Sequence, residues 1–175
     1  LLHVLISILP WQLKRLVLAK CFGFKIDKTA YIGLSVVNVS SMKMAAGSSI
    51  GHFNFIRSVK RVDLEESASI GNLNWITGAV SYLPEKRPSK NTKPGILLIG
   101  KHSAITNRHY IDCSGGFQIG QFSILAGVKT TLLTHSVNMH TSRQNVHGVV
   151  VGNYCFVGTN CVLLLGSHLP DCSVL

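Results

Sequence analysis

The chain has 175 residues and a formal net charge of +10, and 46% of its residues are hydrophobic while only 14% are charged. Because ordinary soluble domains are roughly a quarter charged and disordered chains are poorer in apolar residues, this composition excludes a disordered chain and predicts one domain with a sizeable core. Five cysteines are too few for a small disulfide-stapled domain, and the thinly spread charge argues against a nucleic-acid partner.

The cysteines and carboxylates narrow the chemistry further. The five cysteines are odd in number and contain no Cys-x-x-Cys pair, which favours reduced thiols and a cytoplasmic location. Only seven Asp and Glu residues are available for a paired-carboxylate glycosidase or a magnesium site, whereas eight histidines offer the larger pool of acid and base groups.

The chain begins with a predicted helical cap over residues 1–24. Within 10–23, Pro10 suits the first turn of a helix and Gly23 suits its end. We expect Leu13, Leu16 and Val17 to share the face that covers the end of the following repeats.

The same segment leaves a second interpretation open. Residues 1–9 are apolar but lack the basic flank and the cleavage-site pattern of a signal peptide. Together with Lys14, Arg15 and Lys20 they are compatible with contact at a membrane surface. We therefore expect a cytoplasmic protein, with peripheral contact at the inner membrane surface as an alternative.

Within residues 25–175, apolar residues recur at six-residue spacing in several separate runs. The first run holds Ile26, Ile32, Met44, Ile50, Ile56 and Val62, with Asn38 as its one polar member, and the last holds Val151, Val157, Leu163, Leu169 and Leu175. Six is a multiple of the strand period of two and differs from the helical period of 3.6. The repeat therefore predicts an all-β domain, a β-helix in which short strands stack coil on coil.

Two stretches interrupt the repeat and predict loops. Residues 79–95 hold three prolines and four basic residues, which is typical of a solvated surface loop. Residues 132–148 hold three histidines, His135, His140 and His147. Because a loop carried by a rigid scaffold is a usual place for function, the second excursion is the candidate for chemistry.

The closing repeats resemble a known family. Residues 151–175, VGNYCFVGTNCVLLLGSHLPDCSVL, are similar to the last coils of hexapeptide-repeat acyltransferases, and the resemblance extends over about residues 26–175. It implies a left-handed parallel β-helix, assembly as a homotrimer, and transfer of an acyl group from acetyl-CoA. The fold signal is specific, whereas the reaction must be argued from the site.

The resemblance also implies site residues. In the sugar O-acetyltransferase branch, which includes the colanic-acid type, a Thr-His pair in this loop carries the general base, and Thr134-His135 matches it. An Asn and an Asp five residues later line the acceptor pocket there, and Asn107 and Asp112 match them. An imidazole can take the proton of an attacking hydroxyl at neutral pH, so the expected acceptor is a sugar or saccharide precursor, as in exopolysaccharide biosynthesis.

For the acyl donor, the resemblance implies contacts from Phe156, Gly158 and Thr159 to the pantetheine arm of coenzyme A, in a groove between subunits. The sequence departs from the family here, because no Lys or Arg occurs from Gln144 to Leu175. The residues themselves leave a structural interpretation open, since all three also satisfy the coil repeat.

Several alternatives remain at this point. Asp112 can equally be a corner residue that bonds the backbone, and Cys113 is better explained by packing than as a nucleophile. His135 and His140 are five residues apart, a spacing that would suit a zinc lyase similar to the γ-class carbonic anhydrases. A non-catalytic trimeric solenoid is the third interpretation. The acyltransferase interpretation requires no metal.

Overall fold

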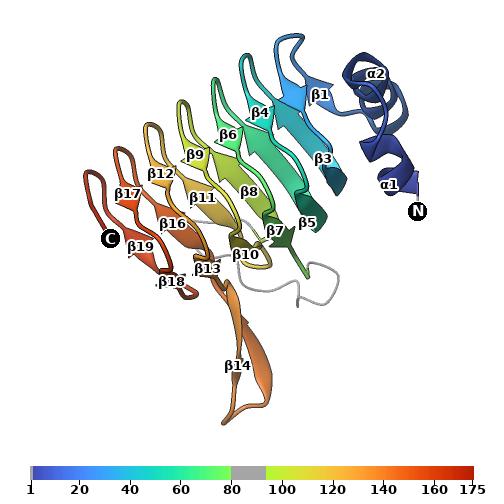
Figure 1. The fold of residues 1–175 in the computed structure, drawn as a ribbon. Coiled ribbons are helices and arrows are strands. Elements are labelled where there is room, and N and C mark those ends of the chain that lie inside the picture. The colour runs from blue at the N-terminus through green and yellow to red at the C-terminus, as the bar shows by residue number, and fades with distance from the viewer. Residues whose placement is uncertain (1, 80–93) are drawn as a thin grey trace.

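The computed structural model describes residues 2–79 and 94–175, and they form a solenoid of parallel strands preceded by two short helices (Figure 1). The helices are α1 (Leu2–Ser7) and α2 (Trp11–Phe22). The all-β architecture with a short helical start agrees with the prediction from the six-residue repeat. Most of the loop expected over 79–95 lies outside the described residues.

Two parallel sheets build the solenoid. The six-stranded sheet holds β2 (Tyr31–Ile32), β4 (Ser49–Ile50), β6 (Ser69–Ile70), β9 (Ala104–Ile105), β12 (Ile124–Leu125) and β17 (Phe156–Val157). The eleven-stranded sheet holds β1 (Lys25–Ile26), β3 (Val36–Met44), β5 (Phe55–Leu64), β7 (Trp75–Thr77), β8 (Ile96–Ile99), β10 (Tyr110–Asp112), β11 (Phe117–Ile119), β13 (Thr131–Leu132), β16 (Val149–Val151), β18 (Val162–Leu163) and β19 (His168–Leu169).

The eleven-stranded sheet bends and supplies two faces of each coil. The long strand β5 pairs with β7 through its first half and with β8 through its second half. The strands β10, β13 and β18 continue the β7 face, and β11, β16 and β19 continue the β8 face. With the six-stranded sheet as the third face, each coil has three faces and three corners (Figure 1).

Away from the two ends of the solenoid, the apolar residues of the six-residue repeat lie inside it. Ile32 is in register with Ile50, Ile50 with Ile70, Ile70 with Ile105 and Ile105 with Leu125, so the same inward position recurs on successive coils. All five side chains are at most 1% exposed. Since burial of such a side chain contributes about 1.5–3 kcal/mol, this apolar column holds the coils together.

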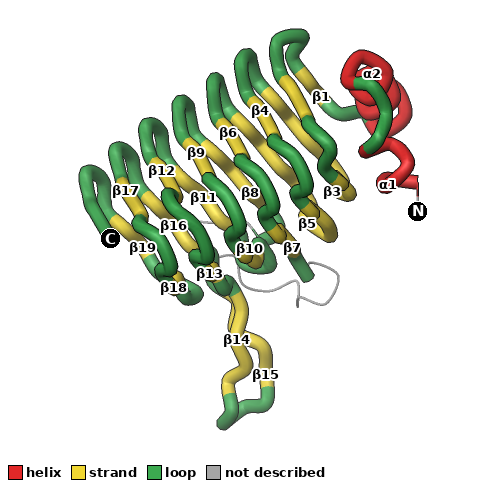
Figure 2. The backbone as a smooth tube through the Cα atoms, viewed as in Figure 1, coloured by secondary structure: helices red, strands yellow, loops and turns green. Residues whose placement is uncertain are grey.

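The histidine-bearing excursion is a β-hairpin. Its strands β14 (His135–Asn138) and β15 (Arg143–Val146) pair antiparallel and form a two-stranded sheet of their own. Figure 2 shows the hairpin projecting from the solenoid after β13, before the chain returns to β16. The prediction that residues 132–148 leave the coil repeat is confirmed, and the segment forms a hairpin.

Helix α2 matches the predicted bounds, but a different side of it packs against the solenoid. Gly23 ends the helix in the left-handed conformation, and the N–H of Phe24 donates to the carbonyl of Leu18 at 3.2 Å. Lys14 and Leu18 are buried, and Val17 is partly buried against the core as expected. Leu13 and Leu16 are about half exposed, so the expected packing face is wrong for these two residues.

The reason is a polar contact at the end of the first coil. Lys14 is almost fully buried and donates from Nζ to the carbonyl of Gly33 at 2.7 Å. A leucine at that position could not satisfy the carbonyl. Within the described residues, neither helix is long and apolar enough to cross a membrane.

A column of buried polar side chains runs up one corner of the solenoid, between the six-stranded sheet and the β10 face. We call it the corner ladder, and its members are Ser35, Asn54, Asn74, His109 and Thr130. Each of the first four accepts the backbone N–H of the next member, at 2.9–3.2 Å. The backbone N–H groups of these buried corner turns therefore all have hydrogen-bond acceptors, although the interior of the solenoid is apolar.

His109 occupies in this ladder the place that asparagines occupy on the two coils before it. Its Nδ1 accepts the N–H of Thr130 at 3.2 Å, and its Nε2 lies 3.0 Å from the hydroxyl oxygen of Thr106. Burial lowers the pKa of His109 to about 4. The neutral ring is therefore the form that fits the corner.

This placement predicts a loss of stability in mild acid. Between about pH 6.5 and pH 4 the unfolded chain protonates His109 while the folded chain does not, so stability falls with falling pH, by about 2 kcal/mol between pH 7 and pH 5. Denaturant unfolding at the two pH values should show a smaller loss for His109→Asn, with His140→Asn on the exposed hairpin turn as the control. Equal losses for the parent and His109→Asn would contradict this role.

Candidate functional site

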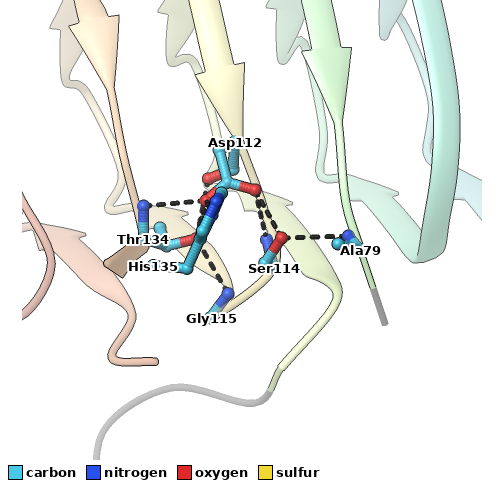
Figure 3. Close-up of polar contacts among 6 residues, drawn as sticks. All are labelled: Ala79, Asp112, Ser114, Gly115, Thr134 and His135. Atoms are coloured by element: carbon cyan, nitrogen blue, oxygen red, sulfur yellow. Dashed lines mark hydrogen bonds and ion pairs between the residues drawn. The ribbon is translucent and has the colours of Figure 1, made fainter. Parts of the chain in front are cut away.

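Two residues predicted from sequence meet at one corner of the solenoid. Asp112 ends β10, and His135 begins β14, with two residues between it and the end of β13. Because β10 and β13 pair in register, with Ile111 opposite Leu132, the residues that follow them come side by side. The Nδ1 of His135 lies 2.7 Å from Oδ2 of Asp112 (Figure 3).

The carboxylate of Asp112 is buried and surrounded by donors. Its Oδ1 accepts the backbone N–H of Ser114 at 3.0 Å and the Ser114 hydroxyl at 2.5 Å. Its Oδ2 accepts the backbone N–H of Thr134 at 2.9 Å and the Thr134 hydroxyl at 2.6 Å, beside the contact with His135. Only 3% of Asp112 is exposed.

These donors decide the charge of the site. Burial by itself would raise the pKa of Asp112, but the hydrogen bonds from Ser114, Thr134 and His135 outweigh it and bring the pKa below its ordinary value. The carboxylate is therefore ionised at neutral pH and can only accept hydrogen bonds.

The ionised carboxylate sets the tautomer of His135. Since Oδ2 of Asp112 accepts, Nδ1 of the ring must donate, and Nε2 keeps its lone pair. Nε2 makes no hydrogen bond within the described parts of the chain, and the His135 side chain is 38% exposed. The arrangement presents an oriented imidazole that can take a proton from a bound group.

A second layer fixes the loop around the pair. The N–H of Gly115 donates to the Thr134 hydroxyl at 2.8 Å, and the N–H of Ala79 donates to the Ser114 hydroxyl at 2.9 Å (Figure 3). A Cβ on Gly115 would lie 2.6 Å from the carbonyl oxygen of His147, so only glycine fits there. The hairpin base is thereby tied to the coil that carries Asp112.

Ser114 and Gly115 were not predicted from the sequence. The signal for Ser114 is local, because an aspartate commonly accepts the N–H and hydroxyl of a serine two residues on, and Asp112-Cys-Ser has that form. Asp112 thus does act as a corner residue that bonds the backbone, and the same carboxylate reaches His135.

Asn107 is not brought to this pair. Its Oδ1 accepts the N–H of Asn72 at 2.7 Å, at the corner that precedes β10, whereas Asp112 lies at the corner that follows it. Five residues of extended chain span up to about 17 Å. The acceptor-binding roles of Asn107 and Asp112 stay predictions.

The three residues expected to contact the acyl donor lie on and after β17. Phe156 is 47% exposed on that strand. The N–H of Gly158 donates to the carbonyl of Leu175 at 2.7 Å, and the hydroxyl of Thr159 donates to the carbonyl of Val128 at 2.8 Å. Gly158 and Thr159 therefore lie at the same corner of the coil as Asn107 and not at that of His135, and Phe156 lies on the strand that leads into that corner.

Other candidate groups take no part in the site. Cys113 is fully buried and burial raises the pKa of its thiol far above the ordinary value, which agrees with the packing explanation. His140 and His147 are exposed. Across residues 2–79 and 94–175, no group of three His, Cys, Asp or Glu side chains lies close enough to hold a metal ion.

Comparisons with known proteins add no family assignment to this geometry. No protein-family model matches the chain, and neither does any curated protein.

Proposed function

We propose that the chain is an acetyl-CoA-dependent O-acetyltransferase that acts on a hydroxyl group of a sugar or saccharide precursor, with His135 as general base. The observation that carries the proposal is the 2.7 Å contact between Nδ1 of His135 and the buried, ionised Asp112. An imidazole held in this way offers Nε2 to a hydroxyl, which is the arrangement that acyl transfer to oxygen requires.

In the proposed mechanism His135 first accepts a proton and later returns it. Nε2 of His135 accepts the proton of the acceptor hydroxyl while the hydroxyl oxygen attacks the thioester carbonyl carbon. The Asp112 carboxylate stabilises the imidazolium that results. When the C–S bond breaks, the imidazolium returns the proton to the departing thiolate of coenzyme A. The acetyl group moves directly from sulfur to oxygen, so no nucleophilic Ser or Cys of the chain is needed.

We further propose a left-handed coil and a homotrimer in which a neighbouring copy completes the site. The six-residue repeat and the three faces of each coil support the coil type. The separation of the residues supports the shared site, because His135 lies at one corner while Asn107 and Thr159 lie at another. The half-exposed Phe156 would give the pantetheine arm an apolar contact.

Loss of the base should nearly abolish turnover. In His135→Ala we expect kcat to fall about 100-fold or more, because a general base contributes about 10²–10⁴-fold. Release of coenzyme A from acetyl-CoA, assayed over a panel of sugars and nucleotide sugars, measures this. His140→Ala on the same hairpin is the control and should match the parent, while a His135→Ala variant as active as the parent would refute the mechanism.

Loss of the carboxylate should act on rate more than on binding. In Asp112→Asn the side chain keeps its shape but no longer enforces Nδ1 as the donor or stabilises the imidazolium, so kcat should fall about 100-fold with little change in acceptor KM. A fall in acceptor affinity at unchanged kcat would instead assign Asp112 to substrate binding, the role that the family resemblance implies.

The donor contact should appear in the KM for acetyl-CoA. Phe156→Ala is expected to raise this KM about tenfold, equivalent to about 1.4 kcal/mol. The control is Phe53→Ala, which removes a more exposed aromatic on a distant coil (64% against 47%) and should leave the KM unchanged. Co-expressed His135→Ala and Phe156→Ala chains should form mixed trimers that are more active at low acetyl-CoA than either variant alone. Mixtures with no gain would place both residues in a site within one copy.

A further inference from the structure

The two N-terminal helices expose many large hydrophobic side chains that have no partner within the described chain. Six large hydrophobic side chains on and beside α1 and α2 are about half or more exposed. They are Leu2, Val4, Leu5, Ile8, Leu13 and Leu16, with exposed fractions of 48–67%. Solvent-exposed clusters of this kind mark a surface that meets another molecule or a membrane.

These side chains are not needed to cap the solenoid. The helices cap the solenoid through other side chains, Ile6, Lys14 and Leu18, which are buried. Trp11 adds an edge-on contact with Tyr31 of the first coil, with ring centroids 5.5 Å apart. The exposed leucines are therefore not required for the contact between the helices and the first coil.

Basic residues accompany this apolar surface. No Asp or Glu occurs among residues 1–26, while Arg15, Lys20 and Lys25 lie in or beside α2. Leu13, Leu16 and Lys20 follow the i, i+3, i+7 spacing and therefore share one side of the helix. Leucines and lysines along one exposed side are typical of helices that lie in the interface of an anionic bilayer.

We propose that the outer side of α1 and α2, which we call the cap surface, binds the surface of a lipid bilayer that contains anionic headgroups. The charge favours this occupant over a second copy of the chain. A cap-to-cap dimer would bring Arg15, Lys20 and Lys25 of each copy together with only Asp27, which lies near Arg15, to offset them, whereas anionic headgroups complement these cations. The proposal is independent of the chemistry proposed for His135.

Vesicle co-sedimentation tests the cap surface directly. The full chain should bind vesicles of phosphatidylglycerol and phosphatidylcholine, and should bind at least about tenfold more weakly to phosphatidylcholine alone or in 1 M salt. The double variant Leu13→Asp, Leu16→Asp should lose at least about tenfold in affinity for the anionic vesicles. Because both positions are exposed, the change should leave the melting temperature unchanged.

The matched control is Leu73→Asp with Leu164→Asp, two leucines of the same exposure on the solenoid, 48% and 50%. It should bind anionic vesicles like the parent. Equal binding by both double variants, or no binding by the parent, would overturn the proposal. So would a drop in the sedimentation mass of the Leu13→Asp, Leu16→Asp variant without vesicles, because this would identify the cap surface as an interface between copies.

Discussion

The in-register parallel pairing of each coil with the next is the constraint on which the rest of the structure depends. It stacks Ile50 on Ile32 and Ile70 on Ile50 in a continuous apolar column. The same register brings the end of β10 beside the end of β13, so that Asp112 and His135 meet although 23 residues separate them. A slip of one residue would turn the inward side chains outward and separate the pair.

Inside such a stack, every polar group must be matched. The corner ladder supplies acceptors for the backbone N–H groups of the turns. At the candidate site, five donor contacts reach the two carboxylate oxygens of Asp112. A buried carboxylate with its donors in place is ionised without needing water. The charge of Asp112 then determines the state of His135, which is more exposed, because the carboxylate fixes which nitrogen of the ring carries the proton.

Features of this fold and site that depend on local sequence patterns could be predicted, whereas features that depend on tertiary contacts could not. The six-residue period predicts the lumen because it depends only on strand alternation and stacking. His135 is predicted from two signals together, the break in the repeat and the resemblance of Thr134-His135 to the Thr-His pair of the family. Lys14 was missed because its burial depends on the carbonyl of Gly33 at the end of the first coil, a tertiary feature. Asn107 and Asp112 are paired by the family resemblance, and a match of two residues five apart does not reveal that a corner lies on either side of β10.

The central claim is that Asp112 holds His135 with its proton on Nδ1, so that Nε2 faces the substrate as a base. Nitrogen NMR of the histidine side chains at pH 8, with His135 assigned by comparison with His135→Ala, measures this directly. The account predicts a protonated Nδ1 and an unprotonated Nε2 in the parent, and a loss of this single tautomer in Asp112→Asn. A parent protein with the proton on Nε2 of His135 would contradict the account.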